Sequence, residues 1–256
     1  CSNPLLNRID RIWWRTQLDN MHGAVASDCP HRERLGYTGD GQLCCEAAMM
    51  LLDSQKFYQK WLEDISDCQS TDNGHVQHTA PFMGGGGGPA GWGGAIAVVP
   101  YEMYKIYGDR ETFRRYLPKI LRYFDYLDSR SSGGLVCREE QGGWCLGDWC
   151  TPEPIAICEP FVNTALCVKQ MLMTKEAAEA IGEKETAQML GRRIEEKRQA
   201  ILNAYYSPQT GSFIGDVQGA NSFATDIGLG GERAYENTRK KYSAADAFDT
   251  GIFGTD

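Results

Sequence analysis

The segment 27–40, SDCPHRERLGYTGD, gathers three carboxylic acids, two arginines, a histidine and a tyrosine within fourteen residues. The acids are Asp28, Glu33 and Asp40, which stand five and seven positions apart, and a proline and two glycines allow an extended entry and sharp turns. The acids of such a cluster can form ion pairs with the arginines, and these pairs can serve only to hold the loop in one conformation. The cluster can equally hold and protonate a ligand, so both interpretations remain open on these residues alone.

Aromatic side chains favour the ligand-binding interpretation. Carboxylates accept hydrogen bonds from hydroxyl groups, and flat aromatic faces stack against C–H surfaces, which together are what a sugar ring requires. The expected site residues in neighbouring loops are Tyr37, His75, His78, Trp92, Trp144 and Trp149, together with Asp148 in the sequence LGDW. Each tryptophan alone is typical of loop packing, but the combination predicts a carbohydrate site.

The elements that must position these residues are helices. Apolar residues recur at steps of three and four through most of the chain, which predicts amphipathic helices. The expected ranges are 4–20, 40–66, 93–107, 111–128, 160–181, 184–206, 220–229 and 232–245. Short stretches such as Leu135–Cys137 could be strands, but nothing sustains a sheet. We therefore expect an all-α fold of helix pairs wound into a toroid, with about eight helices where six pairs would need twelve.

Three long, glycine-rich connections are expected to meet at one end of this toroid. They are Gly23–Gly39, Asp72–Gly94 and Ser131–Glu159. The five glycines at 84–88 are not followed by Lys-Ser/Thr, so they do not indicate a phosphate-binding loop. A flexible rim, or a close approach of the backbone to a ligand, is the plainer interpretation, and no cofactor is expected.

Composition narrows the classes of partner. The 256 residues contain no linker or compositional break, so we expect one domain over residues 1–256. The net charge of −8 disfavours nucleic acid and anionic membrane surfaces as partners. Apolar runs fall short of the roughly 20 residues that span a bilayer, so no membrane insertion is expected. The spacing of the ten cysteines gives little support to a zinc site, and no metal is expected.

At this point a resemblance becomes specific. The sequence DCPHRERLGYTGD resembles the signature loop of the α-L-rhamnosidases of glycoside hydrolase family 78. Supporting similarities are SNPLLNRI and RTQLDN before this loop, GWGGAIAVVPYEMYKIYGD in the middle, LGDW at 146–149 and DTGIFGT at 249–255. They run in the family's order along nearly the whole chain. The resemblance implies a catalytic (α/α)6 barrel that releases terminal α-linked L-rhamnose from a glycoside or polysaccharide with inversion.

The resemblance also implies roles for individual residues. Glu33 matches the general acid, and Asp28 and Asp40 match acids that hold the rhamnose hydroxyls. The remaining implied substrate-binding residues are Arg32, Trp92, Asp148 and Trp149. The family often has an acid after its Trp-Gly pair, where this chain has Gly94, so the sugar would be held differently on that side. As a general acid, Glu33 would need burial or neighbouring carboxylates to raise its pKa.

Inversion needs a second carboxylate about 6.5–9.5 Å from the acid, across the sugar. The resemblance implies a glutamate beyond the region similar to DTGIFGT, and this sequence ends at Asp256. Two explanations stay open. The chain is a piece of a longer polypeptide, whose other segments are then its partners, or it is a shortened homologue that does not hydrolyse glycosides.

Two other functions remain as alternatives. A non-catalytic carbohydrate-binding protein would keep Asp28, Asp40 and Trp149 but lack the base. A polysaccharide lyase of similar helical fold would need a Tyr or His base, for which His75 and His78 are the paired candidates. An enzyme of this type is expected in a periplasm or outside the cell.

Overall fold

The computed structural model of the chain describes residues 1–154, 157–245 and 247–255. Residues 155 and 156, within the predicted third loop, lie outside the described residues. The helices are α1 (Pro4–Asp19), α2 (Thr38–Leu43), α3 (Cys45–Leu51), α4 (Gln55–Asp67), α5 (Ala95–Tyr107), α6 (Arg110–Ser129), α7 (Glu159–Ile181), α8 (Lys184–Tyr205), α9 (Gln218–Asp226), α10 (Gly231–Ala245) and α11 (Ile252–Thr255). A single 3-10 turn, η1, spans Ile214–Asp216.

The two central helices, α5 and α6, show how local sequence sets the boundaries. Gly108 ends α5 in the left-handed region, with φ 68°, which a glycine adopts without strain. Asp109 then caps α6, because its carboxylate accepts a hydrogen bond from the Thr112 amide at 3.0 Å. The apolar face predicted for 111–128 is buried in the core. The predicted break between these helices is confirmed.

The prediction of one long helix over 40–66 is wrong. The structure divides this range into α2, α3 and α4, and with the additional short helix α11 the described residues form eleven α-helices rather than about eight. Leu52 ends α3 in an extended conformation, with φ −123° and ψ 151°. Ser54 precedes α4 and donates a hydrogen bond from its hydroxyl to the Ala48 carbonyl at 3.1 Å. A serine hydroxyl that bonds to the backbone competes with helix continuation, which explains the break.

Three two-stranded hairpins follow the helices α1, α6 and α8. They are β1 (Met21–His22) with β2 (Val25–Ala26), β3 (Ser131–Ser132) with β4 (Leu135–Val136), and β5 (Tyr206–Ser207) with β6 (Ser212–Phe213). All three pairs are antiparallel. Among the described residues no larger sheet forms, in agreement with the short strand patterns of the sequence.

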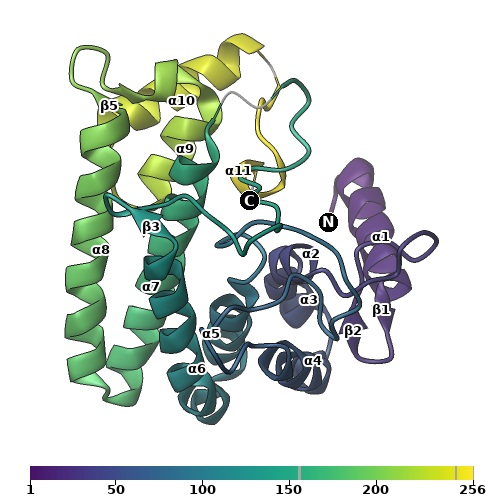
Figure 1. The fold of residues 1–256 in the computed structure, drawn as a ribbon. Coiled ribbons are helices and arrows are strands. Elements are labelled where there is room, and N and C mark those ends of the chain that lie inside the picture. The colour runs from purple at the N-terminus through teal and green to yellow at the C-terminus, as the bar shows by residue number, and fades with distance from the viewer. Residues whose placement is uncertain (155–156, 246, 256) are drawn as a thin grey trace.

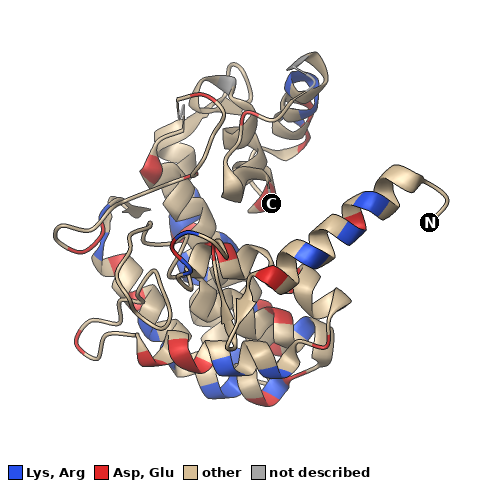
Figure 2. Cartoon of the chain, turned by 90° about the vertical axis from the view of Figure 1, so that its right-hand side faces the viewer, with Lys and Arg blue, Asp and Glu red and all other residues tan. Residues whose placement is uncertain are grey.

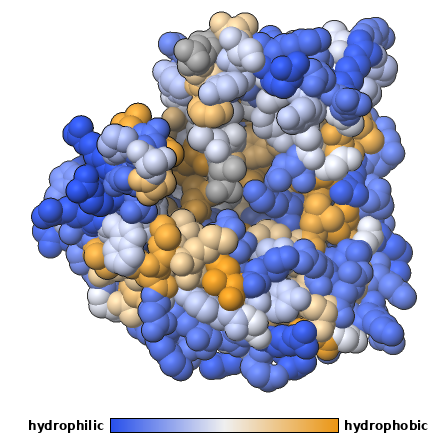
Figure 3. All heavy atoms as spheres, turned by 180° about the vertical axis from the view of Figure 1, so that it is seen from behind, coloured by the Kyte–Doolittle hydropathy of each residue, from blue (hydrophilic) through white to orange (hydrophobic). Residues whose placement is uncertain are grey.

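The helices pack in antiparallel neighbours around a continuous hydrophobic core. The pairs α5 with α6, α7 with α8 and α9 with α10 lie along one another, and α7 also contacts α5 and α6 (Figure 1). Helix α1 stands away from the body, with acidic and basic residues along it (Figure 2). The face in Figure 3 is largely hydrophilic, with hydrophobic residues gathered around a recess. No helix in the described ranges has the length and apolarity to cross a membrane.

Candidate active site

The loops before α2, α5 and α7 are joined by backbone hydrogen bonds, as the sequence predicted. The Thr38 amide donates to the His78 carbonyl at 2.9 Å, and the Ala80 amide donates to the Gly36 carbonyl at 2.9 Å. The Leu146 amide donates to the Gly87 carbonyl at 3.3 Å, which joins the second loop to the third. Three segments far apart in sequence therefore build one wall.

A pocket with a volume of about 300 Å³ lies where these loops meet. Its lining combines three carboxylates with four aromatic rings and two small or aliphatic residues: Asp28, Glu33, Asp40, Tyr37, Trp92, Trp144, Trp149, Gly86 and Leu146. Five of the seven residues to which the resemblance assigns a catalytic or substrate-binding role are among them. The two that do not line it are Arg32 and Asp148.

The three carboxylates differ in their surroundings. Asp28 closes its own loop, because its Oδ1 accepts the Leu35 amide at 3.2 Å. Glu33 is 47% exposed at its side chain, so it reaches solvent as well as the pocket. Burial raises the pKa of Asp40 to about 6; a backbone hydrogen bond opposes this shift, and the negative charges of Asp28 and Glu33 add to it. The pocket thus holds a carboxyl that titrates close to neutral pH.

Tyr37 lies beside these acids. Burial, followed by the negative charges of Glu33 and Asp28, raises the pKa of Tyr37 above its usual value of 10.0. Its hydroxyl is therefore protonated at neutral pH and can donate a hydrogen bond to Glu33 or to a ligand.

Arg32 occupies a different place from the one that the resemblance implied. Its side chain is 73% exposed, and its Nη2 lies 3.8 Å from Glu33 Oε1. It does not line the pocket. A weak, solvent-exposed ion pair beside the predicted acid is what this arrangement provides, rather than a direct contact with a sugar in the pocket.

Trp92 forms the buried floor of the pocket, and Trp144 and Trp149 form its exposed rim. Trp92 is only 3% exposed and packs edge-on against Phe253, with ring centroids 5.2 Å apart. Gly39 permits this, because a Cβ at that position would lie 2.8 Å from the Trp92 Nε1 atom. Trp149 is 43% exposed, and the still more exposed Trp144 joins it on the rim. Exposed rings over a polar pocket are suited to stacking on a sugar.

Asp148, a predicted substrate-binding residue, does not line this pocket and binds backbone amides of the chain. It is fully buried, and its carboxylate accepts hydrogen bonds from the Gly251, Phe253 and Gly254 amides at 2.6, 3.0 and 3.1 Å. Burial raises the pKa of Asp148, and these amides oppose the shift. The acid thereby fastens the segment around α11 to the third loop. Sequence spacing could not show this, because its partners lie more than one hundred residues away.

The glycine at position 94 also has a physical explanation. A Cβ there would lie 2.0 Å from the Gln170 Nε2 atom and 2.6 Å from the Ala90 carbonyl oxygen. Gln170, from α7, donates a hydrogen bond to that same carbonyl at 2.8 Å. The amide of Gln170 therefore occupies the space in which an acidic side chain at position 94 would begin.

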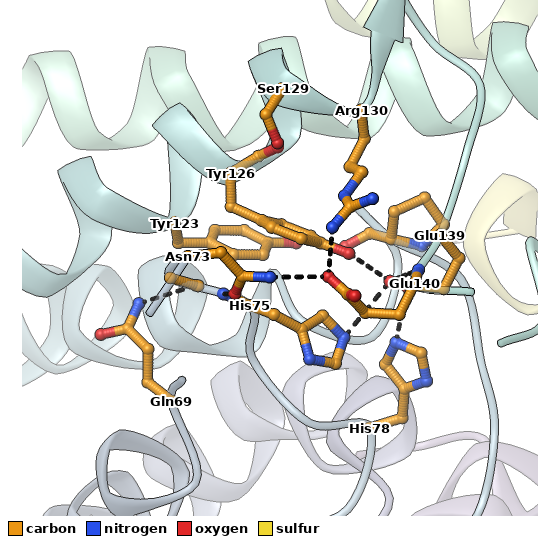
Figure 4. Close-up of polar contacts among 12 residues, drawn as sticks. Gln69, Asn73, His75, His78, Tyr123, Tyr126, Ser129, Arg130, Glu139 and Glu140 are labelled. Carbon is orange, nitrogen blue, oxygen red and sulfur yellow. Dashed lines mark hydrogen bonds and ion pairs between the residues drawn. The ribbon is translucent and has the colours of Figure 1, made fainter. Parts of the chain in front are cut away.

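His75 and His78 are buried in a polar cluster that sequence reasoning missed. Both rings approach Glu139, whose carboxylate lies 3.3 Å from the His75 Nε2 and 2.9 Å from the His78 Nε2 (Figure 4). The two histidines are therefore buried beside an acid and do not reach the pocket. The i, i+3 spacing of the two histidines is visible in the sequence, but nothing in it links them to an acid 61 residues from His78.

The cluster is held from the other side as well. Tyr126, on α6, donates a hydrogen bond to Glu139 Oε1, and the Glu140 amide donates to the same oxygen at 2.8 Å. Burial alone would raise the pKa of Glu139, but the two histidines and the Tyr126 hydroxyl outweigh it and hold that pKa well below its usual range. None of these side chains lines the pocket described above.

Comparison with known proteins agrees with the fold. A family model described as the bacterial alpha-L-rhamnosidase 6 hairpin glycosidase domain matches residues 1–256. An alpha-L-rhamnosidase of Streptomyces avermitilis is 33% identical over 231 residues, which cover 88% of this chain and 21% of that protein. One from Formosa agariphila is 32% identical over 178 residues, covering 64% of this chain and 18% of that protein.

Solved structures give the same result. The crystal structure of the Streptomyces avermitilis alpha-L-rhamnosidase complexed with L-rhamnose has a TM-score of 0.90 and 28% identity, covering 99% of this chain and 24% of that one. The alpha-L-rhamnosidase from Dictyoglumus thermophilum, at 22% identity and a TM-score of 0.89, shares the fold over 100% of this chain and 30% of that one.

These matches confirm the predicted helical-barrel fold class, and the chain spans about a fifth of the length of the curated relatives that it matches. Because the family model covers every residue, the chain belongs to the bacterial alpha-L-rhamnosidase six-hairpin glycosidase domain family.

Proposed function

We propose that the protein containing this chain is an α-L-rhamnosidase that removes terminal α-linked L-rhamnose from a glycoside or polysaccharide. The observation that carries the proposal is the pocket itself, in which Asp28, Glu33 and Asp40 face the rings of Trp144 and Trp149. Carboxylates bind sugar hydroxyls and aromatic faces bind C–H surfaces, so the lining is suited to a monosaccharide. The rhamnose bound in the similar Streptomyces avermitilis structure supports the choice of sugar.

The proposed mechanism assigns Glu33 as the general acid. Its carboxyl reaches both the pocket and solvent, so it can give a proton to the leaving glycosidic oxygen and recover one from water. Asp28 and Asp40 would accept hydrogen bonds from the sugar hydroxyls, while Trp149 stacks on the ring. A water activated by a general base on the opposite face of the sugar would then give inversion. We place that base in a part of the protein beyond this chain.

Asp40 is a second candidate for the proton donor. Its pKa of about 6 lies closer to neutral pH than that of an ordinary carboxyl, which is the property that a general acid needs. Its burial, in contrast to the exposure of Glu33, suits a residue that fixes a hydroxyl. Activity of the Glu33→Gln and Asp40→Asn variants across pH separates the two assignments, because only loss of the acid removes the alkaline limb of the rate profile.

Other segments of the same polypeptide are the proposed partners of this chain. Helix α1 exposes a row of large apolar residues: Leu5, Leu6, Ile9, Ile12 and Leu18. Apolar patches of this kind mark interfaces, and the relatives are several times longer than this chain. We infer that the remainder of the protein covers α1. Its location in a periplasm or outside the cell stays a prediction.

The test is turnover of an aryl α-L-rhamnoside by the full-length protein. We expect wild type to release rhamnose and Glu33→Gln to lose about 10²–10⁴-fold in kcat, since proton donation contributes that much. Glu63→Gln is the matched control, because Glu63 is an exposed acid on α4 that pairs with Arg115 at 3.5 Å and does not line the pocket. Full activity of Glu33→Gln refutes the assignment of the acid.

Two further readouts separate the alternatives. The first sugar anomer formed, followed by NMR, should be the β anomer if the reaction inverts; the α anomer would instead indicate retention. The non-catalytic alternative predicts that the full-length wild type binds L-rhamnose and releases none from any aryl rhamnoside.

A further inference from the structure

We propose that His75, His78 and Glu139 form a binding site for a divalent transition-metal ion, best suited to Zn²⁺, that joins the second and third loops of the pocket. Each residue offers one ligand atom, and these three atoms lie within 4.8 Å of one another. Two imidazoles and one carboxylate are a donor set that zinc accepts, with a water completing the coordination. The proposal does not depend on the sugar chemistry of the pocket.

The spacing of the donor atoms fits a small metal ion. Ligands about 2.0–2.2 Å from a tetrahedral zinc ion lie roughly 3.3–3.6 Å from one another. The His75 Nε2 lies 3.3 Å from one carboxylate oxygen of Glu139, and the His78 Nε2 lies 2.9 Å from the other. Small rotations of the two rings would bring the donors to this spacing without moving the backbone.

The burial of the histidines gives independent support. His75 is 8% exposed, and among the described side chains its Nε2 is one of the few buried polar atoms without a hydrogen-bond partner, although it faces the Glu139 carboxylate. A buried polar atom with no partner costs about 1–3 kcal/mol. A metal ion between the rings would satisfy this nitrogen, which the hydrogen bond from His78 to Glu139 leaves without a partner.

Neighbouring groups orient the proposed ligands as metal sites require. The Tyr126 hydroxyl and the Glu140 amide both donate to Glu139 Oε1, the oxygen nearest His75, and Oε2 faces His78 (Figure 4). The His75 ring packs edge-on against Tyr126, with centroids 5.1 Å apart. Hydrogen bonds and packing of this kind hold ligands in place and typically raise metal affinity 10- to 100-fold.

The position of the site suggests its effect. His75 and His78 precede the glycine run whose Gly86 lines the pocket, and Glu139 precedes Trp144 and Leu146, which line it from the third loop. A metal ion would link the two loops at a second place, in addition to the backbone hydrogen bond between Leu146 and Gly87. It would therefore act as a structural clamp on the rim and not as a catalytic metal.

The test is zinc binding by the full-length protein after removal of metal with EDTA. Titration calorimetry and elemental analysis are expected to show one more Zn²⁺ per chain in wild type than in His78→Gln or Glu139→Gln, or a more than 100-fold weaker site in these variants. His22→Gln is the matched control, because His22 is an exposed histidine on β1, and it should bind as wild type does. Equal zinc content and affinity in all four proteins overturns the proposal.

A measurement on wild type alone covers the case in which the variants fail to fold. Zn²⁺ added to the metal-free protein should slow backbone hydrogen exchange in peptides covering 75–80 and 137–141, and leave the peptide covering 20–25 unchanged. Unaltered exchange in the first two segments would contradict a metal site at this position.

Discussion

Asp40 combines two properties that are normally opposed, because it is a partly buried acid in a pocket that already holds two other carboxylates. Burial comes first among the causes that raise its pKa to about 6, and the charges of Asp28 and Glu33 contribute after it. The chain keeps this acid at a cost to its own stability, which is expected of a residue retained for binding or catalysis.

The cost can be measured through the pH dependence of stability. Between the ordinary pKa of 3.8 and the folded value of about 6, the folded protein binds more protons at Asp40 than the unfolded chain does. Stability therefore falls as pH rises through this interval, by up to about 3 kcal/mol. We expect Asp40→Asn to remove this dependence and to be more stable than wild type at pH 8. Urea unfolding at pH 4, 6 and 8 measures it, and an Asp40→Asn variant with the wild-type slope would contradict the shift.

At this scale the sequence predicted the grouping of residues better than their individual roles. The acids of the first loop are close in sequence, so their meeting in one pocket could be foreseen. Asp148 could not be assigned, because its partners around α11 are distant in sequence and its burial follows from tertiary packing. The cluster at Glu139 was missed for the same reason.

The short helix α2 is the element that brings the first loop against the core. Two tryptophan rings pack directly against glycines of α2. A Cβ at Gly39 would lie 2.8 Å from Trp92, and a Cβ at Gly41 would lie 2.1 Å from Trp61. Trp61 is fully buried in the core, whereas Trp92 also lines the pocket. The two neighbouring glycines therefore serve separate functions.

This difference predicts distinct effects of two similar variants. Gly39→Ala and Gly41→Ala should each lower the free energy of unfolding by about 1–3 kcal/mol, because both force a ring to move. Only Gly39→Ala should also weaken binding of L-rhamnose, since it displaces Trp92. Denaturant unfolding and sugar titration of both full-length variants measure this, and equal sugar affinity in the two would argue against a role for Trp92.

Helix boundaries could be predicted only where the sequence contains a recognisable capping residue. Gly108 and Asp109 separate α5 from α6 through their own backbone preference and side chain. The break before α4 involves the Ser54 hydroxyl, which bonds to the Ala48 carbonyl, and the apolar periodicity that continues through 40–66 conceals it.

In the whole molecule, helix α1 extends away from the body (Figure 2). Large apolar residues on this helix are exposed to solvent. Ile9, in the middle of α1, is 53% exposed. A row of exposed apolar residues is costly in water, and the family relatives contain several times more chain than this one. The arrangement of α1 follows if the rest of the protein packs against it.

A single substitution on α1 tests this inference. In the full-length protein, Ile9→Asp should lower the free energy of unfolding by about 2–5 kcal/mol, because it places a charge in an apolar interface. Asp10→Asn, on the exposed polar side of the same helix, should change it by less than about 0.5 kcal/mol. Thermal unfolding compares the two, and a neutral Ile9→Asp would mean that α1 stays uncovered.

The central claim is that the pocket between the three loops binds rhamnose, and titration of the full-length protein with L-rhamnose tests it most directly. We predict saturable binding that Asp28→Asn weakens about 10- to 100-fold, because a hydrogen bond to a charged group is worth about 1.5–3 kcal/mol. Glu63→Gln should leave the affinity unchanged. Wild type that does not bind the sugar, or equal binding by Asp28→Asn, would contradict the account.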